Sequence, residues 1–140
     1  MQTYRRIAGT AIVIAQLIAP LASPQQPSAD RSVVPAANEL SDQEVQDTWK
    51  QFCANLRSGN RPGALKHMTE SSRELYRETL EAMGDAVRRL PDAWSQPQLV
   101  RFYGDDLAEY VLTETVDGES RIHVVVFAKS PEGMWLIESL

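Results

Sequence analysis

The last third of the chain alternates apolar and polar residues in the two-residue period that is typical of β-strands. Two such runs, residues 107–116 and 119–129, are separated by Asp117 and Gly118. Asp-Gly between β-branched runs strongly indicates a two-residue hairpin turn, because both turn positions need a positive φ. We therefore expect an antiparallel hairpin here, with the upstream chain covering one face of its sheet.

A second turn signal, residues 130–133 (SPEG), leads into a further apolar run at residues 134–140. Proline suits the fixed φ of a type I turn, and glycine accepts the positive φ that follows. Upstream, the β-rich segment 98–103 is bounded by Pro97 and Gly104. These three signals extend the hairpin to a four-stranded antiparallel sheet.

Residues 40–59 show the spacing of three and four that places apolar side chains on one face of a helix. The apolar positions are Val45, Trp49, Phe52, Cys53 and Leu56. Ser41 and Glu44 have the spacing of a capping box, and Leu40 that of a hydrophobic staple. We expect the helix to begin at this cap and to end at Gly59.

Residues 60–68 predict a short second helix, which Asn60 can cap. A third helix is expected to start at Thr69 or Ser71 and to continue until Pro91 ends it. Its apolar line is Leu75 or Tyr76, Leu80, Met83, Val87 and Leu90, with Gly84 weakening it. Helices followed by strands imply an α+β fold with three helices on one face of a curved sheet.

The two-residue turn fixes which residues share a face of the sheet, because it pairs Val116 with Glu119 and steps outward from there. The face expected to lie under the helices carries Tyr110, Leu112, Val125, Phe127, Trp135 and Ile137. The other face carries Val111, Thr113, Ile122, Val124, Val126, Met134 and Leu136. We call this second face the outer face.

An antiparallel sheet with one solvent-exposed face should present polar residues on that face. The outer face is instead apolar, and no helix is left to cover it, which is typical of an interface. We expect a homodimer or a docked protein partner there, through Val111, Ile122, Val124, Val126, Met134 and Leu136. The alternative is that β-branched residues stand there because they form strands well.

Residues 1–22 have the layout of a secretory signal: Arg5 and Arg6 precede an apolar run of about a dozen residues, too short to span a bilayer. We expect cleavage after Ala22, then a flexible leader at residues 23–39 rich in Pro, Ser, Gln and Ala. The folded domain would then comprise residues 40–140. The protein is expected to be periplasmic or secreted; the alternative is an uncleaved signal that anchors it to a membrane.

The net charge of −5 disfavours nucleic acid as a partner, because the chain has no basic stripe to attract a phosphate backbone. The single cysteine, Cys53, excludes an internal disulfide and is expected in the core. His67 and His123 lie on different predicted elements, so we expect no metal site. We also expect no cofactor, since no glycine-rich phosphate loop precedes a helix.

A nucleophilic catalytic set is also missing from the sequence, which lacks the Gly-x-Ser-x-Gly motif and clusters its serines in caps and loops. Aromatic and polar residues of the helices and inner sheet face could instead surround a small apolar ligand. The candidates for this pocket are Trp49, Phe52, Tyr76, Tyr110, His123, Phe127 and Trp135.

The order of elements, with Trp49, Phe52 and Leu56 along the first helix, resembles the nuclear transport factor 2-like superfamily, a cone of helices against a curved sheet. The resemblance covers residues 41–140 and is closest to small exported bacterial domains. That superfamily includes steroid isomerases, dehydratases, polyketide cyclases and plain binding modules. Its enzymes use a carboxylate, His or Tyr inside the cone; here Tyr76, Tyr110 and His123, with Asp105 or Asp106 at the rim, are of those types.

No acid–base pair in this sequence matches the isomerase or dehydratase patterns of that superfamily. We therefore expect an exported domain that acts by association, through the outer face or the mouth of the cone, without catalysis. A small apolar-ligand binder that uses the cone interior is the alternative, and an isomerase- or cyclase-like enzyme is a further one.

Overall fold

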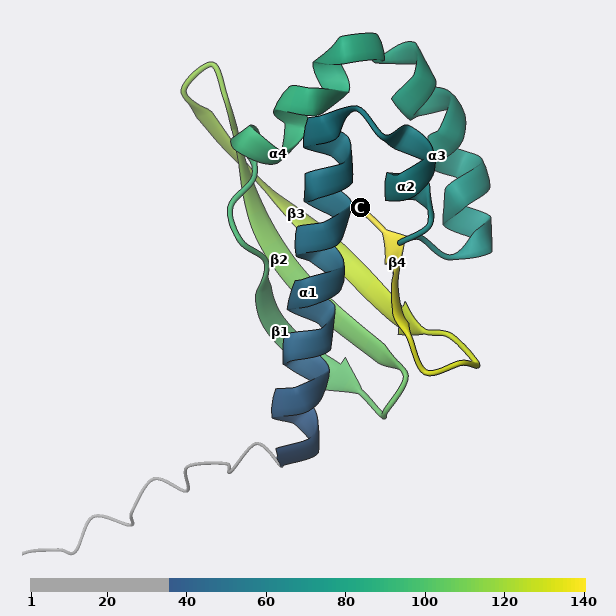
Figure 1. Ribbon diagram of the computed structural model, residues 1–140. Helices are drawn as coiled ribbons and strands as arrows, with labels where there is room; N and C mark the ends of the chain where they lie inside the picture. Colours follow the sequence, from purple (N-terminus) through teal and green to yellow (C-terminus); the bar gives the residue numbers. More distant parts are fainter. Residues whose placement is uncertain (1–35) are drawn as a thin grey trace, which may run out of the picture. The chain divides into compact units, whose positions relative to one another are not determined.

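A computed structural model describes residues 36–140 of the chain (Figure 1). The expected signal at residues 1–22 and most of the expected leader lie outside these residues. Five helical segments precede the sheet: α1 (Ala36–Ser58), α2 (Arg61–Leu65), α3 (Glu70–Ala82), η1 (Gly84–Arg89, a 3₁₀-helix) and α4 (Leu90–Ala93). Four strands follow: β1 (Gln98–Tyr103), β2 (Leu107–Val116), β3 (Glu119–Lys129) and β4 (Trp135–Ser139). The α+β class is confirmed.

Helix α1 begins earlier than its capping signal suggests. It starts at Ala36, so Ser41 lies inside the helix and the predicted capping box is wrong. Leu40 is 70% exposed and therefore forms no hydrophobic staple. The predicted end is confirmed: Gly59 has a φ of 76°, and the amide of Asn60 donates to the carbonyl of Asn55 at 2.8 Å. This is the Schellman arrangement that closes a helix.

Asn60 caps α2, as its position predicts. Its Oδ1 accepts from the amide of Gly63 at 3.0 Å, and its Nδ2 donates to Asn55 Oδ1 at 2.9 Å. A Cβ on Gly63 would overlap both asparagine side chains. Gly63 is therefore required by close packing against the cap.

Replacing Gly63 by alanine is expected to lower the free energy of unfolding by about 1–2 kcal/mol, although alanine favours helices, because the cap must be displaced. Urea unfolding of Gly63→Ala checks this. In the background of Asn60→Gly the added cost should be smaller, because one of the two clashing side chains is gone and Asn55 is released from its hydrogen bond to Asn60. A stabilised Gly63→Ala single variant would contradict the packing argument.

The predicted third helix is interrupted at Gly84. Thr69 caps α3, its side chain accepting from the amide of Ser72, but the helix ends at Ala82. Gly84 has a φ of 54°, which interrupts the α-helical backbone, so the chain continues as η1, which starts at Gly84, and then as α4. Pro91 was predicted to end the third helix. It lies instead in the first turn of α4, where proline is tolerated.

The sheet has the predicted order and register. Its strands run antiparallel in the order β1-β2-β3-β4, with Tyr110 opposite Val125 and Ala108 opposite Phe127. The Asp117-Gly118 turn has φ values of 53° and 82°, as a two-residue hairpin requires. The predicted inner-face residues are all buried: Tyr110, Leu112, Val125, Phe127, Trp135 and Ile137.

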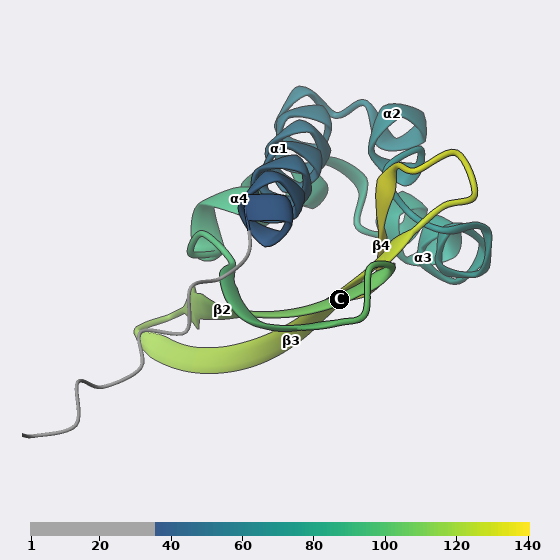
Figure 2. The same cartoon turned by 90° about the horizontal axis from the view of Figure 1, so that it is seen from below.

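The helices lie on one side of the sheet, as Figure 2 shows in a view along it. Strand β4 also pairs with the segment that joins α2 to α3. The amide of Ile137 donates to the carbonyl of His67 at 2.8 Å, and the amide of Thr69 donates to the carbonyl of Ile137 at 3.0 Å. The edge of the sheet at β4 is therefore closed by the chain itself.

Candidate functional site

The outer face of the sheet is not covered by any described helix (Figure 2). Its central side chains are Ile122, 78% exposed, and Val124, 50% exposed. Met134, at the end of the β3–β4 turn, is 57% exposed. The register places Val111 beside Val124, and Ala128 beside Leu136, on this face. Val111, Ile122 and Val124 thus lie together on β2 and β3, whereas Met134 and Leu136 line a cleft that also contains Thr48 of α1 and His67.

A polar cluster at β1 flanks this surface, and sequence reasoning did not find it. Tyr103 Oη donates to Glu109 Oε2 at 2.7 Å, and the Arg101 guanidinium lies 3.4 Å from the same oxygen. That guanidinium also lies 4.4 Å from the centre of the Tyr103 ring. The hydrogen bond from Tyr103 holds the pKa of Glu109 below its usual value. A charged boundary thus limits the apolar surface on this side.

The predicted ligand-pocket residues form three groups, and the first is packed as a core. Phe52, Tyr110 and Phe127 are fully buried. The Tyr110 and Phe127 rings lie 5.3 Å apart edge to face, and Trp49 lies 5.6 Å from Phe52. A ligand in this interior would have to displace these side chains, because they fill the space between helix and sheet.

Trp94 completes this aromatic core, although its place in a connecting segment gave no periodic signal. Its ring is stacked on Phe52 at 6.4 Å and lies 5.4 Å from Trp49. On the sheet, Tyr110 Oη donates to Asp42 Oδ1 of α1 at 2.6 Å. Burial, with the Asp42 hydrogen bond, raises the pKa of Tyr110, so this phenol stays neutral at physiological pH.

Tyr76 and His123 lie apart from the other pocket candidates. Tyr76 Oη donates to the carbonyl of Leu140 at 2.5 Å and accepts from its amide at 3.1 Å, which fixes α3 to the end of the chain. His123 Nε2 lies 2.9 Å from Glu114 Oε2, near the turn of the β2–β3 hairpin. The seven residues therefore do not surround one common cavity.

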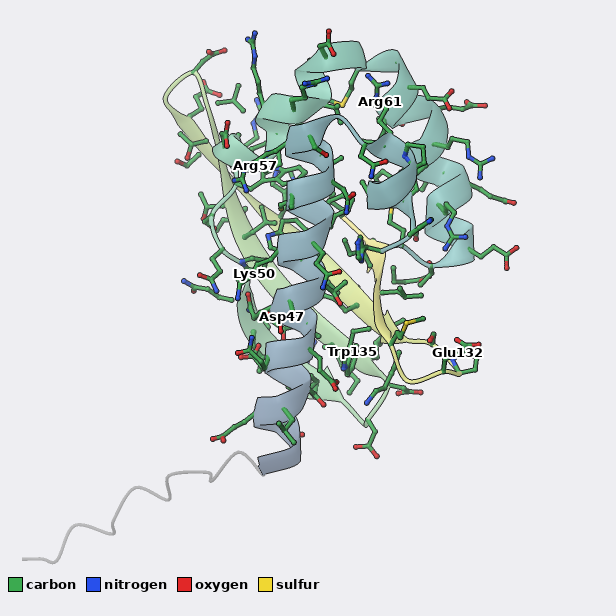
Figure 3. All side chains as sticks on the ribbon, in the orientation of Figure 1. Asp47, Lys50, Arg57, Arg61, Glu132 and Trp135 are labelled. Carbon is green, nitrogen blue, oxygen red and sulfur yellow. The ribbon has the colours of Figure 1, made fainter. Side chains whose placement is uncertain are left out.

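Two of the pocket candidates border open space. Trp49 lines a cleft of about 240 Å³. Trp135 lines two larger clefts, of about 460 and 550 Å³, which share Glu44, and Figure 3 shows Trp135 between α1 and the β3–β4 turn. Its indole Nε1 is buried and has no hydrogen-bond partner among the described residues. Lys129 Nζ lies 5.3 Å from the ring centre. The two clefts at Trp135 lie between α1 and the strands, at the open end of the space between helices and sheet.

Cys53 lies in the core, as predicted, and is 6% exposed. Burial raises the pKa of its thiol from 9.0 to about 11, so the nucleophilic thiolate is scarce at neutral pH. Within residues 36–140, no three His, Cys, Asp or Glu side chains gather as metal ligands would.

The buried thiol should make stability fall at alkaline pH. The folded state keeps a proton that the unfolded chain releases, so this contribution is complete below pH 9 and is lost as the pH rises to about 11. The loss is expected to reach about 2–3 kcal/mol at most. Urea unfolding at pH 8, 9.5 and 11 should show a shallower decline for Cys53→Ala than for the wild type. Equal slopes would contradict the burial of an ionisable thiol.

No protein-family model matches this chain, and no curated protein or solved structure shows significant similarity to it. None of the helices within residues 36–140 combines the length and the apolar character needed to cross a membrane.

Proposed function

We propose that residues 36–140 form an association domain of the nuclear transport factor 2-like kind, which pairs with a second copy of the same chain through the outer face. The uncovered apolar side chains of Ile122 and Val124, with Val111 beside Val124, carry this proposal. Contiguous apolar surface outside a filled core is typical of protein interfaces. The packed interior favours this function over ligand binding inside the cone.

The size of the outer face supports a weak, reversible dimer. Strands β2, β3 and β4, of 10, 11 and 5 residues, about 4.8 Å apart and rising about 3.3 Å per residue, present roughly 400 Å² per copy. Two copies would bury about 800 Å², a size typical of weak, transient interfaces. A two-fold axis would place the same surface on both partners, so one self-complementary apolar face is sufficient.

The net charge of −5 gives this dimer a characteristic salt dependence. Two copies repel each other at low ionic strength, and salt screens that repulsion while leaving apolar contacts intact. Association should therefore strengthen as salt is added. A dimer held by ion pairs would show the opposite trend.

Light scattering and sedimentation over a concentration series test the proposal. We expect a monomer–dimer equilibrium with a dissociation constant in the micromolar range, tighter in 0.5 M than in about 0.05 M salt. A protein that remains monomeric at millimolar concentration in both salts would overturn it.

We further propose that residues 1–22 direct export of this domain, with cleavage after Ala22. The positive pair Arg5 and Arg6 and the short apolar run that follows support this. N-terminal sequencing of the protein recovered from the periplasm or medium tests it. An intact Met1 would favour the uncleaved, membrane-anchored form.

A further inference from the structure

A cleft of about 440 Å³ between α2 and α3 gathers four cationic side chains in an otherwise acidic protein. It is lined by Arg61, Pro62, Leu65, Lys66, Arg73, Arg77 and Glu81. Helices α2 and α3, which border it, lie beside β4 and not over the outer face of β2 and β3 (Figure 2). We refer to it as the α2–α3 cleft. Its volume is within the range of small-molecule sites.

The cations of this cleft lack carboxylate partners. Among residues 36–140, ion pairs form at six other places and include none of Arg61, Lys66 or the two α3 arginines. Arg73 donates to the carbonyls of Leu65 and Met68 at 3.1 and 3.2 Å, which holds its guanidinium at the end of α2. That guanidinium keeps further N–H groups free for an anion.

Helix α3 separates its charges into stripes. Arg73 and Arg77 are four residues apart and lie on the side of the cleft, whereas Glu70, Glu74 and Glu78 repeat with the same spacing on a neighbouring stripe. Glu81 continues the arginine stripe one turn further on, and Arg77 therefore has Glu74 and Glu81 at spacings that stabilise a helix. The cleft side of α3 carries two arginines and one glutamate.

Arg61 adds a buried donor. Its Nε is inaccessible to solvent and has no hydrogen-bond partner among the described residues. Figure 3 shows Arg61 near the junction of α1 and α2, at the end of the molecule that carries α3. Buried donors are normally paired, and this nitrogen is one of two exceptions among the described residues.

The floor of the cleft is apolar. Pro62 is exposed and Leu65 is largely buried, and both line the space between the cationic groups. Long arginine and lysine side chains also contribute their aliphatic stems to such a surface. A ligand that fits has an anionic head group for the guanidinium groups and an apolar body for the floor.

We propose that the α2–α3 cleft binds a free anionic amphiphile, with Arg61 and Arg77 contacting its carboxylate and Leu65 its alkyl chain. Planar guanidinium groups match carboxylate oxygens in pairs, which favours this head group. This site is independent of the outer face and of self-association.

Calorimetric titration with decanoate tests the proposal, with acetate and decyltrimethylammonium as ligands that lack the chain or carry the opposite charge. We expect decanoate to bind at least tenfold more tightly than either. Arg61→Gln and Arg77→Gln should each weaken binding about tenfold, the loss of one charge-assisted contact. Glu81→Gln should strengthen it, because the only carboxylate that lines the cleft becomes neutral.

Arg89→Gln, an exposed arginine outside the cleft, is the matched control and should leave binding unchanged. Equal binding of decanoate and decyltrimethylammonium, or wild-type affinity in both arginine variants, would overturn the proposal. So would sedimentation with phosphatidylglycerol vesicles without any binding of free decanoate, since the ligand would then be a membrane surface. The gain expected for Glu81→Gln cannot be produced by loss of folding.

Discussion

Replacing Phe127 by alanine should lower the free energy of unfolding by about 3–5 kcal/mol, the usual cost of removing a buried phenylalanine. Phe127 is fully buried and packs edge to face on Tyr110 and on Trp49, at 5.3 and 6.5 Å between ring centres. It is therefore in contact with both layers, and neighbouring rings cannot collapse fully into the space it leaves. Chemical unfolding of the variant measures the loss.

The same variant tests whether the interior of the wild type has room for a ligand. Engineered apolar cavities in protein cores bind benzene. Benzene should stabilise Phe127→Ala and leave the wild type unchanged, because the wild-type rings occupy that space. Ile122→Ala, on the same strand but exposed on the outer face, is the control and should cost less than about 1 kcal/mol. Stabilisation of the wild type by benzene would restore the hypothesis of a ligand site inside the cone.

The sheet was predictable because the residues that determine its register are close together in the sequence. A two-residue turn at Asp117 and Gly118 leaves only one register, and the period of two then assigns every side chain to a face. Tyr110 and Phe127 could be placed in the core, and Ile122 and Val124 outside, without knowing where the helices lie.

The helix boundaries were less predictable because several local signals compete. Ser41 and Glu44 have capping-box spacing. The preceding residues Ala36 and Ala37 favour helix, however, and α1 begins there and continues through Ser41 and Glu44. At Gly84 the opposite occurred: the apolar spacing continues beyond it, yet the backbone adopts a positive φ and redirects the chain. Spacing shows which residues can share a face; it does not fix the backbone between them.

Some candidate sites follow from local sequence patterns, and others depend on how distant segments pack. The outer face follows from strand alternation, whereas the cluster of Arg101, Tyr103 and Glu109 depends on how β1 pairs with β2 across an irregular register. The α2–α3 cleft needed the packing of two helices, although Arg73 and Arg77 at helical spacing gave a local sign of it. Trp94 joins the core through stacking that no period could indicate.

Replacing Val124 by lysine should weaken self-association at least 100-fold. Val124 is central on the outer face, and a two-fold dimer would bury the introduced charge twice, without a partner. The isolated domain should lose little stability, since the side chain is already 50% exposed. Sedimentation of the variant and the wild type at matched concentrations measures the shift in the dissociation constant.

Leu75→Lys is the matched control, because Leu75 is an equally apolar side chain on α3, 70% exposed and away from the outer face. Either lysine changes the net charge from −5 to −4 and so reduces the general repulsion between copies. Overall electrostatics therefore predicts slightly stronger association for both variants. Loss of the dimer in Val124→Lys alone would consequently have to come from burial of Val124, whereas equal behaviour of the two variants would remove the outer face from the interface.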